Sequence, residues 1–326
     1  MKNLSSEKIH WLKNHVPASH AEYMEISAAA NTMPGRFPKM LYLEVGWECN
    51  LDCTFCSKPS RRKPSRLMEL ADYERVLVEC SESGLYYLNL HFFNEPLLHL
   101  DMLMPVIRRA KALGIPMVAV TTNATPLTRD VMVGLRDAGL DALHVSFEGA
   151  DAKVYERVRG VKSRTVAARV TAAAAVPKRP YMTICLMRTT ETDEQIVAFG
   201  EIWSRVVDKV EIRPVLEFLG RIQEPEHAVI PDHRIPCRYL GDRLAILSDG
   251  TFTGCSVDVD GDLRLGNVLD GDTVSGVWNS EGYRWLWSMH AFQEWEGLPE
   301  PCRSCKSWDF TATDRSERYV CGKRSV

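Results

Sequence analysis

The sequence lacks the features that would place the protein in a membrane, on a nucleic acid or outside the cell. It has no apolar run of about eighteen residues, the length needed for a membrane-spanning helix. No cluster of Lys and Arg stands out, and the formal net charge is −3, which argues against a nucleic-acid footprint. The N-terminal region has no apolar stretch behind a basic head, as a secretory signal would have. We therefore expect a cytoplasmic protein with no membrane or nucleic-acid partner.

Internal repeats and low-complexity tracts are also missing, so neither a solenoid nor a disordered chain is indicated. The chain has 326 residues and 45% hydrophobic content, enough for one large domain and a smaller one. Cysteine, in contrast, is plentiful, with ten in the chain. Since disulfides are rare in a reducing compartment, this number indicates metal ligands.

From about residue 40, strand and helix patterns alternate. The predicted strands are 41–46, 87–92, 116–122, 142–147, 181–187 and 209–217. The predicted helices between them are 68–83, 100–113, 127–138, 162–176 and 192–206. This order predicts parallel βα units that curl into a partial (β/α)6 barrel of the TIM type. In such barrels the reactive groups gather at the C-terminal ends of the strands.

The segments on either side of this pattern differ from it. Residues 5–30 are predicted to form a helix that covers the barrel. After a proline-rich linker at 221–236, Ser248-Asp249-Gly250 predicts a hairpin turn, and a helix is expected at 273–290. The α/β chain is thus divided into a helical segment (1–38), the barrel (39–222) and a small C-terminal domain (223–326). A domain of this size has too small a hydrophobic core to be stable alone, and a bound metal centre would stabilise it.

Three cysteines follow the first predicted strand at spacing C-x3-C-x2-C: Cys49, Cys53 and Cys56. Three thiolates on one short loop can hold three irons of a cubane [4Fe-4S] cluster. With no fourth cysteine nearby, one iron stays open for a small molecule. The alternative is a zinc loop or a chance grouping.

The cysteine loop resembles that of the radical S-adenosylmethionine (SAM) enzymes, which have this spacing after the first strand of a partial barrel. Phe55 matches the aromatic residue that precedes their last cysteine. The resemblance implies that SAM chelates the open iron through its amino and carboxylate groups. It also implies reductive cleavage of SAM to a 5′-deoxyadenosyl radical, which abstracts a hydrogen atom from an unactivated C–H bond.

Motifs at the later strand ends are similar to those of the same family. Phe93-Asn94-Glu95-Pro96 stands where the family has Gly-Gly-Glu-Pro, and the resemblance implies that Glu95 contacts the SAM amino group. Thr121-Thr122-Asn123 is similar to the family's Thr-Asn-Gly near the cofactor. Ser146 and Glu148 match a Ser-x-Asp-Gly motif near the ribose and methionine of SAM. Arg159 matches an arginine that can pair with the SAM carboxylate.

A second group of cysteines lies in the C-terminal region. Cys302-x2-Cys305 is a metal knuckle by spacing, and the region resembles the SPASM/twitch extension of radical SAM enzymes. With five cysteines here, the shorter twitch-like form with one auxiliary [4Fe-4S] cluster is favoured over the full SPASM form. The ligands we expect, similar in spacing to those of aminocyclitol- and aminoglycoside-modifying radical SAM dehydrogenases, are Cys237, Cys255, Cys302 and Cys305. Structural zinc is the alternative. Cys321 is then the spare cysteine, either a free thiol or a ligand in place of Cys237. Cys80 and Cys185 are interpreted as small buried hydrophobes.

The resemblance leaves several reactions open. The leading hypothesis is oxidation of a secondary alcohol of a sugar, aminocyclitol or aminoglycoside to a ketone in antibiotic biosynthesis. Arg213 or Arg221 would then act near the substrate, by electrostatics because arginine is hard to deprotonate. Epimerisation with Cys321 as hydrogen-atom donor is a second hypothesis.

Modification of a ribosomal peptide is a third hypothesis, ranked lower because only 48 residues precede Cys49. A zinc-stabilised binding module is the non-enzyme alternative. Each enzyme hypothesis implies an external electron donor such as flavodoxin or ferredoxin. The sequence encodes neither the substrate nor the oligomeric state.

Overall fold

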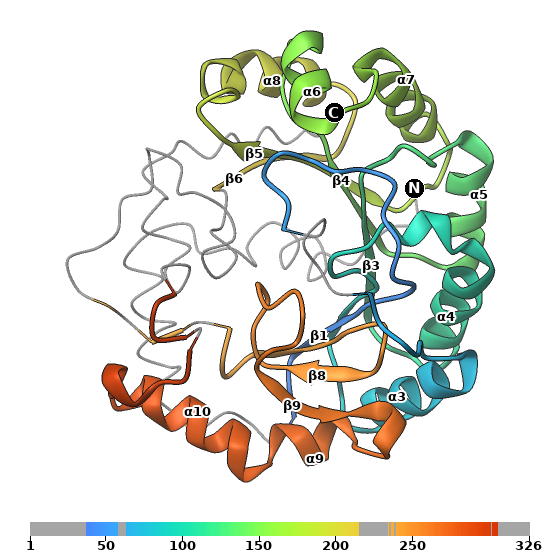
Figure 1. The fold of residues 1–326 in the computed structure, drawn as a ribbon. Coiled ribbons are helices and arrows are strands. Elements are labelled where there is room, and N and C mark those ends of the chain that lie inside the picture. The colour runs from blue at the N-terminus through green and yellow to red at the C-terminus, as the bar shows by residue number, and fades with distance from the viewer. Residues whose placement is uncertain are drawn as a thin grey trace.

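The structure, a computed structural model, describes residues 37–57, 63–214, 234, 236, 237, 239–300 and 302–305. Its centre is one nine-stranded sheet in the spatial order β6-β5-β4-β3-β2-β1-β7-β8-β9 (Figure 1). The first six strands are β1 (Met40–Leu43), β2 (Tyr87–Asn89), β3 (Met117–Thr122), β4 (Ala142–Ser146), β5 (Tyr181–Arg188) and β6 (Lys209–Pro214). β6 and β9 are the two edges, so within the described residues the sheet is an open, partial barrel.

The first six strands pair in parallel, each with the next along the chain. Parallel strands buried on both faces read as nearly continuous apolar runs, and β3 and β4 are almost fully buried. The six predicted strands are confirmed in position and order, but β1 and β2 end three residues earlier than predicted, and 215–217 lie outside the described residues. All six strands point their C-terminal ends toward one edge, which is where the cysteine loop and the later motifs follow.

Helices line the outer face of the barrel, as Figure 1 shows for its right-hand and upper sides. They are α3 (Leu70–Glu82), α4 (Leu100–Ala112), α5 (Arg129–Ala138), α6 (Ala152–Arg159), α7 (Ser163–Ala174) and α8 (Ile196–Trp203).

The short helix α6 was not among the sequence predictions. Asp151 begins it by accepting hydrogen bonds from the backbone N–H groups of Lys153 and Val154, and Gly160, at φ 75°, ends it. Arg159 is therefore the last residue of a fixed turn.

The C-terminal region continues the barrel sheet. β7 (Arg243–Ile246) pairs in parallel with β1, and β8 (Thr251–Thr253) returns antiparallel to β7, which confirms the hairpin. β9 (Arg264–Asn267) completes the sheet. The single helix predicted at 273–290 is wrong, because two helices, α9 (Val274–Trp278) and α10 (Glu281–Ala291), occupy this stretch. The Ser280 hydroxyl accepts the backbone N–H of Tyr283 and so starts the second helix.

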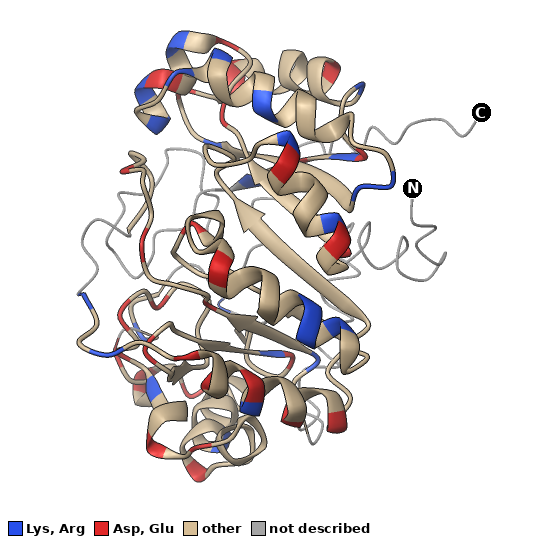
Figure 2. Ribbon diagram, turned by 90° about the vertical axis from the view of Figure 1, so that its right-hand side faces the viewer, with Lys and Arg blue, Asp and Glu red and all other residues tan. Residues whose placement is uncertain are grey.

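One hydrophobic core serves both predicted domains. Leu41 and Val45 of the barrel belong to the same buried cluster as Phe252, Trp278 and Tyr283 of the C-terminal region. The predicted boundary at 222/223 and the predicted helix at 5–30 lie outside the described residues. Charged residues of both signs are interspersed along the outer helices (Figure 2). Among the described residues, none of the helices has the length and apolar character needed to span a bilayer.

Candidate functional site

The loop that carries the first three cysteines leaves the C-terminal end of β1 and is fixed by backbone hydrogen bonds. The N–H of Thr54 donates to the carbonyl of Val158 at 3.0 Å, and the N–H of Glu95 donates to the carbonyl of Glu48 at 2.8 Å. The N–H of Cys56 donates to the carbonyl of Cys53 at 3.0 Å, which closes a turn between these two ligand candidates. The loop is thus tied both to the end of α6 and to the loop after β2.

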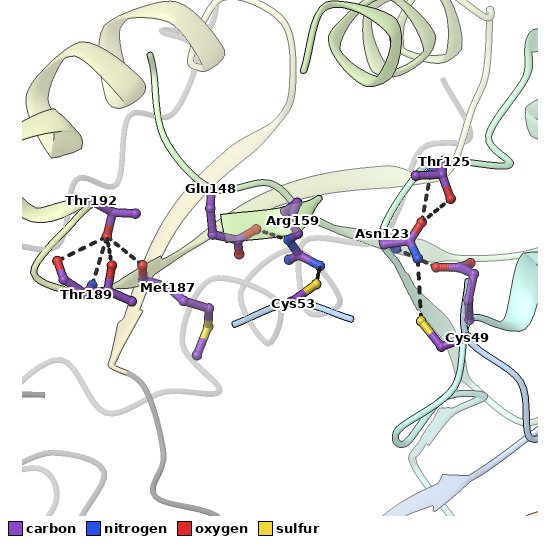
Figure 3. A network of polar contacts seen from close by, with 10 residues as sticks. Cys49, Cys53, Asn123, Thr125, Glu148, Arg159, Met187, Thr189 and Thr192 are labelled. Atoms are coloured by element: carbon purple, nitrogen blue, oxygen red, sulfur yellow. Dashed lines mark hydrogen bonds and ion pairs between the residues drawn. The ribbon is translucent and has the colours of Figure 1, made fainter. Parts of the chain in front are cut away.

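Arg159 joins this loop to the fourth strand of the barrel. Its guanidinium forms an ion pair with Glu148, which is fully buried, and donates a hydrogen bond to Cys53 Sγ at 3.3 Å (Figure 3). It also lies 5.3 Å from the centre of the Phe55 ring. The sequence resemblance assigned Arg159 to the SAM carboxylate, whereas here it contacts a cysteine and a carboxylate of the chain itself.

The charges around Arg159 are coupled. Burial works against the charged form of Arg159, but Glu148, Cys53 and Tyr155 together outweigh burial, so the pKa of Arg159 is raised. Burial raises the pKa of the Cys53 thiol to about 11, and Arg159 opposes that rise. The second oxygen of Glu148, Oε1, is buried and makes no hydrogen bond to the described residues. It therefore remains available as an acceptor for a bound molecule.

Asn123 holds the other end of the cysteine loop. Its Nδ2 donates to Cys49 Sγ at 3.7 Å and to Asn50 Oδ1 at 3.0 Å. Its Oδ1 accepts from the hydroxyl of Thr125 at 2.6 Å, which fixes the orientation of the amide (Figure 3). Two of the three candidate cluster ligands, Cys49 and Cys53, thus contact residues that the sequence assigned to the cofactor site.

Glu95 lies at the centre of the same edge and is almost completely buried. Its carboxylate accepts hydrogen bonds from the Thr122 hydroxyl at 2.7 Å and from the backbone N–H groups of Asn123 at 2.6 Å and Leu97 at 3.0 Å. Burial raises the pKa of Glu95 from 4.5 to about 7, although these hydrogen bonds oppose the rise. A carboxyl group whose pKa lies near 7 is readily ionised by a positively charged group bound beside it.

Ser146 and Arg213 lie on neighbouring parts of the barrel interior. Ser146 ends β4, and its register partner on β5 is Cys185. Cys185 in turn is the register partner of Glu211 on β6, and its Sγ is 3.6 Å from Glu211 Oε2. Arg213 pairs with the same Glu211 oxygen at 2.7 Å, and its side chain is 36% exposed. The sequence-predicted Arg213 is therefore an ion-paired residue at the barrel mouth.

Glu211 is the residue of this group that the sequence interpretation missed. Burial raises the pKa of Cys185 to about 12, and Arg213 opposes the rise. Cys185 is buried as expected, and its thiol also contacts the Glu211 carboxylate. The signal was the alternation of Lys209, Glu211 and Arg213 along β6, which puts charged side chains on one face of a strand.

The second cysteine group comes together in the C-terminal region. Burial raises the pKa of Cys255, and the nearby Cys237 and Cys302 raise it further. Burial likewise raises the pKa of Cys302, with further contributions from Cys237 and Cys305. Cys237 and Cys302 therefore lie within electrostatic range of Cys255, and Cys305 within range of Cys302. Across the described parts of the chain, no three Cys, His, Asp or Glu side chains converge closely enough to hold a single metal ion. A cubane cluster needs less convergence, since each thiolate binds a different iron.

Two predicted site residues, Arg221 and Cys321, lie outside the described residues. Arg188, at the end of β5, is paired with Asp193.

Comparison with known proteins is consistent with this geometry. Residues 44–201 match the model of the radical SAM superfamily, and residues 237–306 match the SPASM model, an iron–sulfur cluster-binding domain. PqqA peptide cyclase of Gluconobacter oxydans (strain 621H) is 26% identical over 82% of this chain and 83% of that protein. GTP 3′,8-cyclase of Synechococcus sp. (strain CC9902) is 33% identical, over 41% of this chain and 39% of that protein.

Solved structures show the same fold at low sequence identity. Streptococcus suis SuiB bound to precursor peptide SuiA has a TM-score of 0.66 at 16% identity, with 81% of this chain and 69% of that chain covered. BtrN in complex with AdoMet and 2-DOIA has a TM-score of 0.58 at 17% identity, with 84% and 94% covered.

The two domain matches, with the cysteine loop and the strand-end residues, define the class: the chain belongs to the radical SAM superfamily. More particularly, it is a radical SAM enzyme with a C-terminal SPASM domain. These domains imply a SAM-binding [4Fe-4S] cluster and auxiliary iron–sulfur binding, which displaces the zinc alternative. The donors fit these groups, because three thiols share one loop, four more fall within the SPASM match, and Glu148 Oε1 is buried without a hydrogen-bond donor among the described residues.

Proposed function

We propose that this enzyme modifies a peptide, by hydrogen-atom abstraction from a carbon of one of its residues. The observation that carries the proposal is the length of the match to PqqA peptide cyclases. Two of them, from Gluconobacter oxydans and Methylocella silvestris, align over 82–84% of this chain and over 82–83% of their own lengths. The GTP 3′,8-cyclase match covers less than half of either chain. Similarity through both domains favours the peptide hypothesis over the oxidation of an aminocyclitol.

We assign roles to the residues at the strand ends as part of this proposal. Cys49, Cys53 and Cys56 would hold three irons of the first cluster, leaving the fourth open. When bound there, SAM supplies a 5′-deoxyadenosyl radical. Glu95 would accept a hydrogen bond from the amino group of SAM.

Further contacts to SAM would come from the neighbouring strand ends. Glu148 Oε1 would accept a hydrogen bond from a hydroxyl of the ribose, next to Ser146. Arg159 and Asn123 would fix the cysteine loop through Cys53 and Cys49.

The barrel interior beside this site would bind the peptide segment that reacts. Arg213, whose side chain is 36% exposed, would bind a carbonyl or carboxylate of that segment, and its ion pair with Glu211 would keep it oriented. Cys237, Cys255, Cys302 and Cys305 would hold an auxiliary [4Fe-4S] cluster. An external one-electron donor such as flavodoxin or ferredoxin completes the system.

A second candidate function is oxidation of a secondary alcohol in a small polar substrate. It is favoured by the extent of the match to BtrN, 94% of whose chain is covered, which is similarity of fold alone. Glu211 would then serve as a proton acceptor beside Arg213. Epimerisation with Cys321 as donor is a variant of this small-molecule hypothesis, and it predicts deuterium on the substrate carbon after reaction in deuterated water.

The two candidates are separated by measuring 5′-deoxyadenosine in anaerobically reconstituted enzyme with SAM and reductant. Short peptides encoded beside the gene form one arm, and aminocyclitols and sugars form the other. We expect a peptide to raise 5′-deoxyadenosine formation above the substrate-free rate and to change in mass itself. Stimulation by an aminocyclitol with no response to any peptide would reverse the order of the two candidates.

A further inference from the structure

Glu44 is a fully buried carboxylate whose two oxygens accept hydrogen bonds from loops far apart in the sequence. Oε1 accepts the backbone N–H of Phe93 at 3.0 Å, and Oε2 accepts the backbone N–H of Ser248 at 2.9 Å. Phe93 belongs to the loop that carries Glu95, whereas Ser248 belongs to the hairpin turn between β7 and β8. One side chain thus joins the loop assigned to SAM with the first hairpin of the SPASM domain.

The backbone of Glu44 is fixed from two further directions. Its N–H donates to the carbonyl of Ile246 at 2.9 Å, and its carbonyl accepts the hydroxyl of Tyr73 at 2.8 Å. A buried carboxylate requires hydrogen-bond donors to offset its loss of hydration. The backbone of Glu44 is held by these two hydrogen bonds. Its two carboxylate oxygens therefore fix the loop after β2 and the turn between β7 and β8 relative to β1.

Apolar packing reinforces the same contact. The rings of Phe92 and Phe93 meet edge to face at 4.4 Å between centroids, and both pack in one buried cluster with Ala245, Leu247 and Val259. We call Glu44, Phe92, Phe93, Ser248 and Val259 the Glu44 junction. At this junction the loop after β2 and the SPASM hairpin share one core.

The junction also accounts for a departure from the family motif. Phe93 and Asn94 replace two glycines that precede the Glu-Pro pair. The Asn94 side chain bonds to the backbone of Phe92 and Val45, while the N–H of Phe93 points to Glu44. The loop that glycines would leave flexible is therefore held by its own Asn94 side chain and by the carboxylate of Glu44, the residue after β1.

We propose that Glu44 is a positioning residue that holds the SAM-binding loop in register with the SPASM hairpin. The proposal rests on the assignment of Glu95 to SAM made above. Replacing Glu44 by Gln leaves one acceptor oxygen and turns an NH2 group toward a backbone donor, so one of the two loops is released.

The test compares Glu44→Gln with Asp141→Asn in anaerobically reconstituted enzyme. Asp141 is the control, because its buried carboxylate also accepts a backbone N–H, from Val118 at 2.9 Å, and is paired with Lys111 at 2.6 Å, but at the opposite end of the sheet. Two quantities are measured, the dissociation constant for SAM and amide hydrogen exchange in peptides covering 90–97 and 246–253.

We expect Glu44→Gln to weaken SAM binding about tenfold and to speed exchange in at least one of the two peptides. Asp141→Asn should lower the melting temperature but leave both readouts unchanged. The proposal is overturned if Glu44→Gln behaves like Asp141→Asn, losing stability while SAM affinity and local exchange stay as in the wild type.

Two further variants keep the test decisive. If Glu44→Gln does not fold, Glu44→Asp keeps the charge but is one methylene too short to reach both loops, and it takes the same measurements. Glu95→Gln tests the underlying assignment. If it leaves SAM affinity unchanged, the role of Glu95 is wrong, whereas the exchange data still decide whether Glu44 holds the two loops together.

Discussion

Arg159 donates a hydrogen bond to the sulfur of Cys53, 106 residues earlier in the chain, while its guanidinium is paired with the buried Glu148. The cation thus sits between a candidate cluster ligand and the strand-end carboxylate. Any cluster held by Cys53 would have a positive charge and an N–H donor beside one thiolate. Hydrogen bonds to the sulfurs are among the features that set cluster potentials.

The first prediction concerns the stability of this pair. Replacing Arg159 by Gln leaves Glu148 buried without its cation, which should lower the free energy of unfolding by about 3–5 kcal/mol. Arg159→Lys keeps the charge and should cost less. Urea denaturation of the cluster-free protein measures the loss directly. The exposed Arg109–Glu74 pair is the control, and Arg109→Gln should leave stability unchanged within error. Equal effects at the two pairs would contradict the assigned burial of Arg159.

The second prediction is the pH dependence of SAM binding through Glu95. Its pKa in the folded protein is about 7, above the ordinary 4.5, because it is buried. A SAM ammonium group favours the ionised form, so binding below pH 7 must release a proton. SAM affinity should therefore fall about tenfold for each pH unit below 7. Calorimetric titration in buffers of different ionisation enthalpy measures both affinity and proton release.

The same shift has a consequence for stability. Between about pH 4.5 and 7 the folded protein binds more protons at Glu95 than the unfolded chain does. The contribution of Glu95 to the free energy of unfolding therefore decreases as pH rises through this window. Glu95→Gln should abolish both pH effects. If SAM affinity in Glu95→Gln still falls steeply below pH 7, a group other than Glu95 is responsible for the pH dependence.

The fold was predictable because its information is local. Apolar runs such as 116–122 and 142–147 alternate with amphipathic helices, and the chirality of βα units then dictates an open parallel barrel. The rule that reactive groups follow the strands correctly placed Glu95, Asn123 and Glu148 on one edge. The contact of Cys49 with Asn123 required no more than that rule.

The remaining features depend on distances that periodicity does not encode. Whether Arg159 faces SAM or Cys53 depends on how α6 docks, and α6 is a helix of only eight residues that the sequence interpretation did not include. Glu44 was interpreted as part of the apolar strand 41–46, so its contacts with Phe93 and Ser248 were not predicted. Cys185 was interpreted from its own strand, although its charged neighbour Glu211 comes from the next one.

The third prediction is the iron content. Reconstituted wild-type enzyme with two cubane clusters should contain about eight irons per chain, with brown colour that bleaches on reduction. Replacing both Cys302 and Cys305 by Ser should leave about four irons. Iron and sulfide analysis after gel filtration checks both values. Cys80→Ser is the matched control, because Cys80 is fully buried in α3, and it should retain the wild-type content. If the double variant still contains about eight irons per chain, Cys302 and Cys305 are not cluster ligands.

The fourth prediction separates substrate handling from SAM chemistry. Arg213 and Glu211 contact each other at 2.7 Å on β6, inside the barrel. Arg213→Gln and Glu211→Gln should each lower substrate-dependent turnover about 100-fold, the scale of a lost electrostatic or proton-transfer contribution, because either change disrupts the pair. SAM affinity and the slow cleavage of SAM without substrate should stay near wild type. Product formation and 5′-deoxyadenosine, both followed by mass spectrometry, give the two rates.

Arg188→Gln is the control for this prediction, because Arg188 ends the neighbouring strand β5 but is paired with Asp193 outside the Glu211 group. It should retain wild-type turnover. If Arg188→Gln and Arg213→Gln impair turnover equally, the effect reflects the charge of the barrel mouth as a whole and not the Arg213–Glu211 pair. If both Glu211→Gln and Arg213→Gln reduce SAM affinity, the pair belongs to the cofactor site, and the interior of the barrel beside Cys185 loses its assignment to substrate.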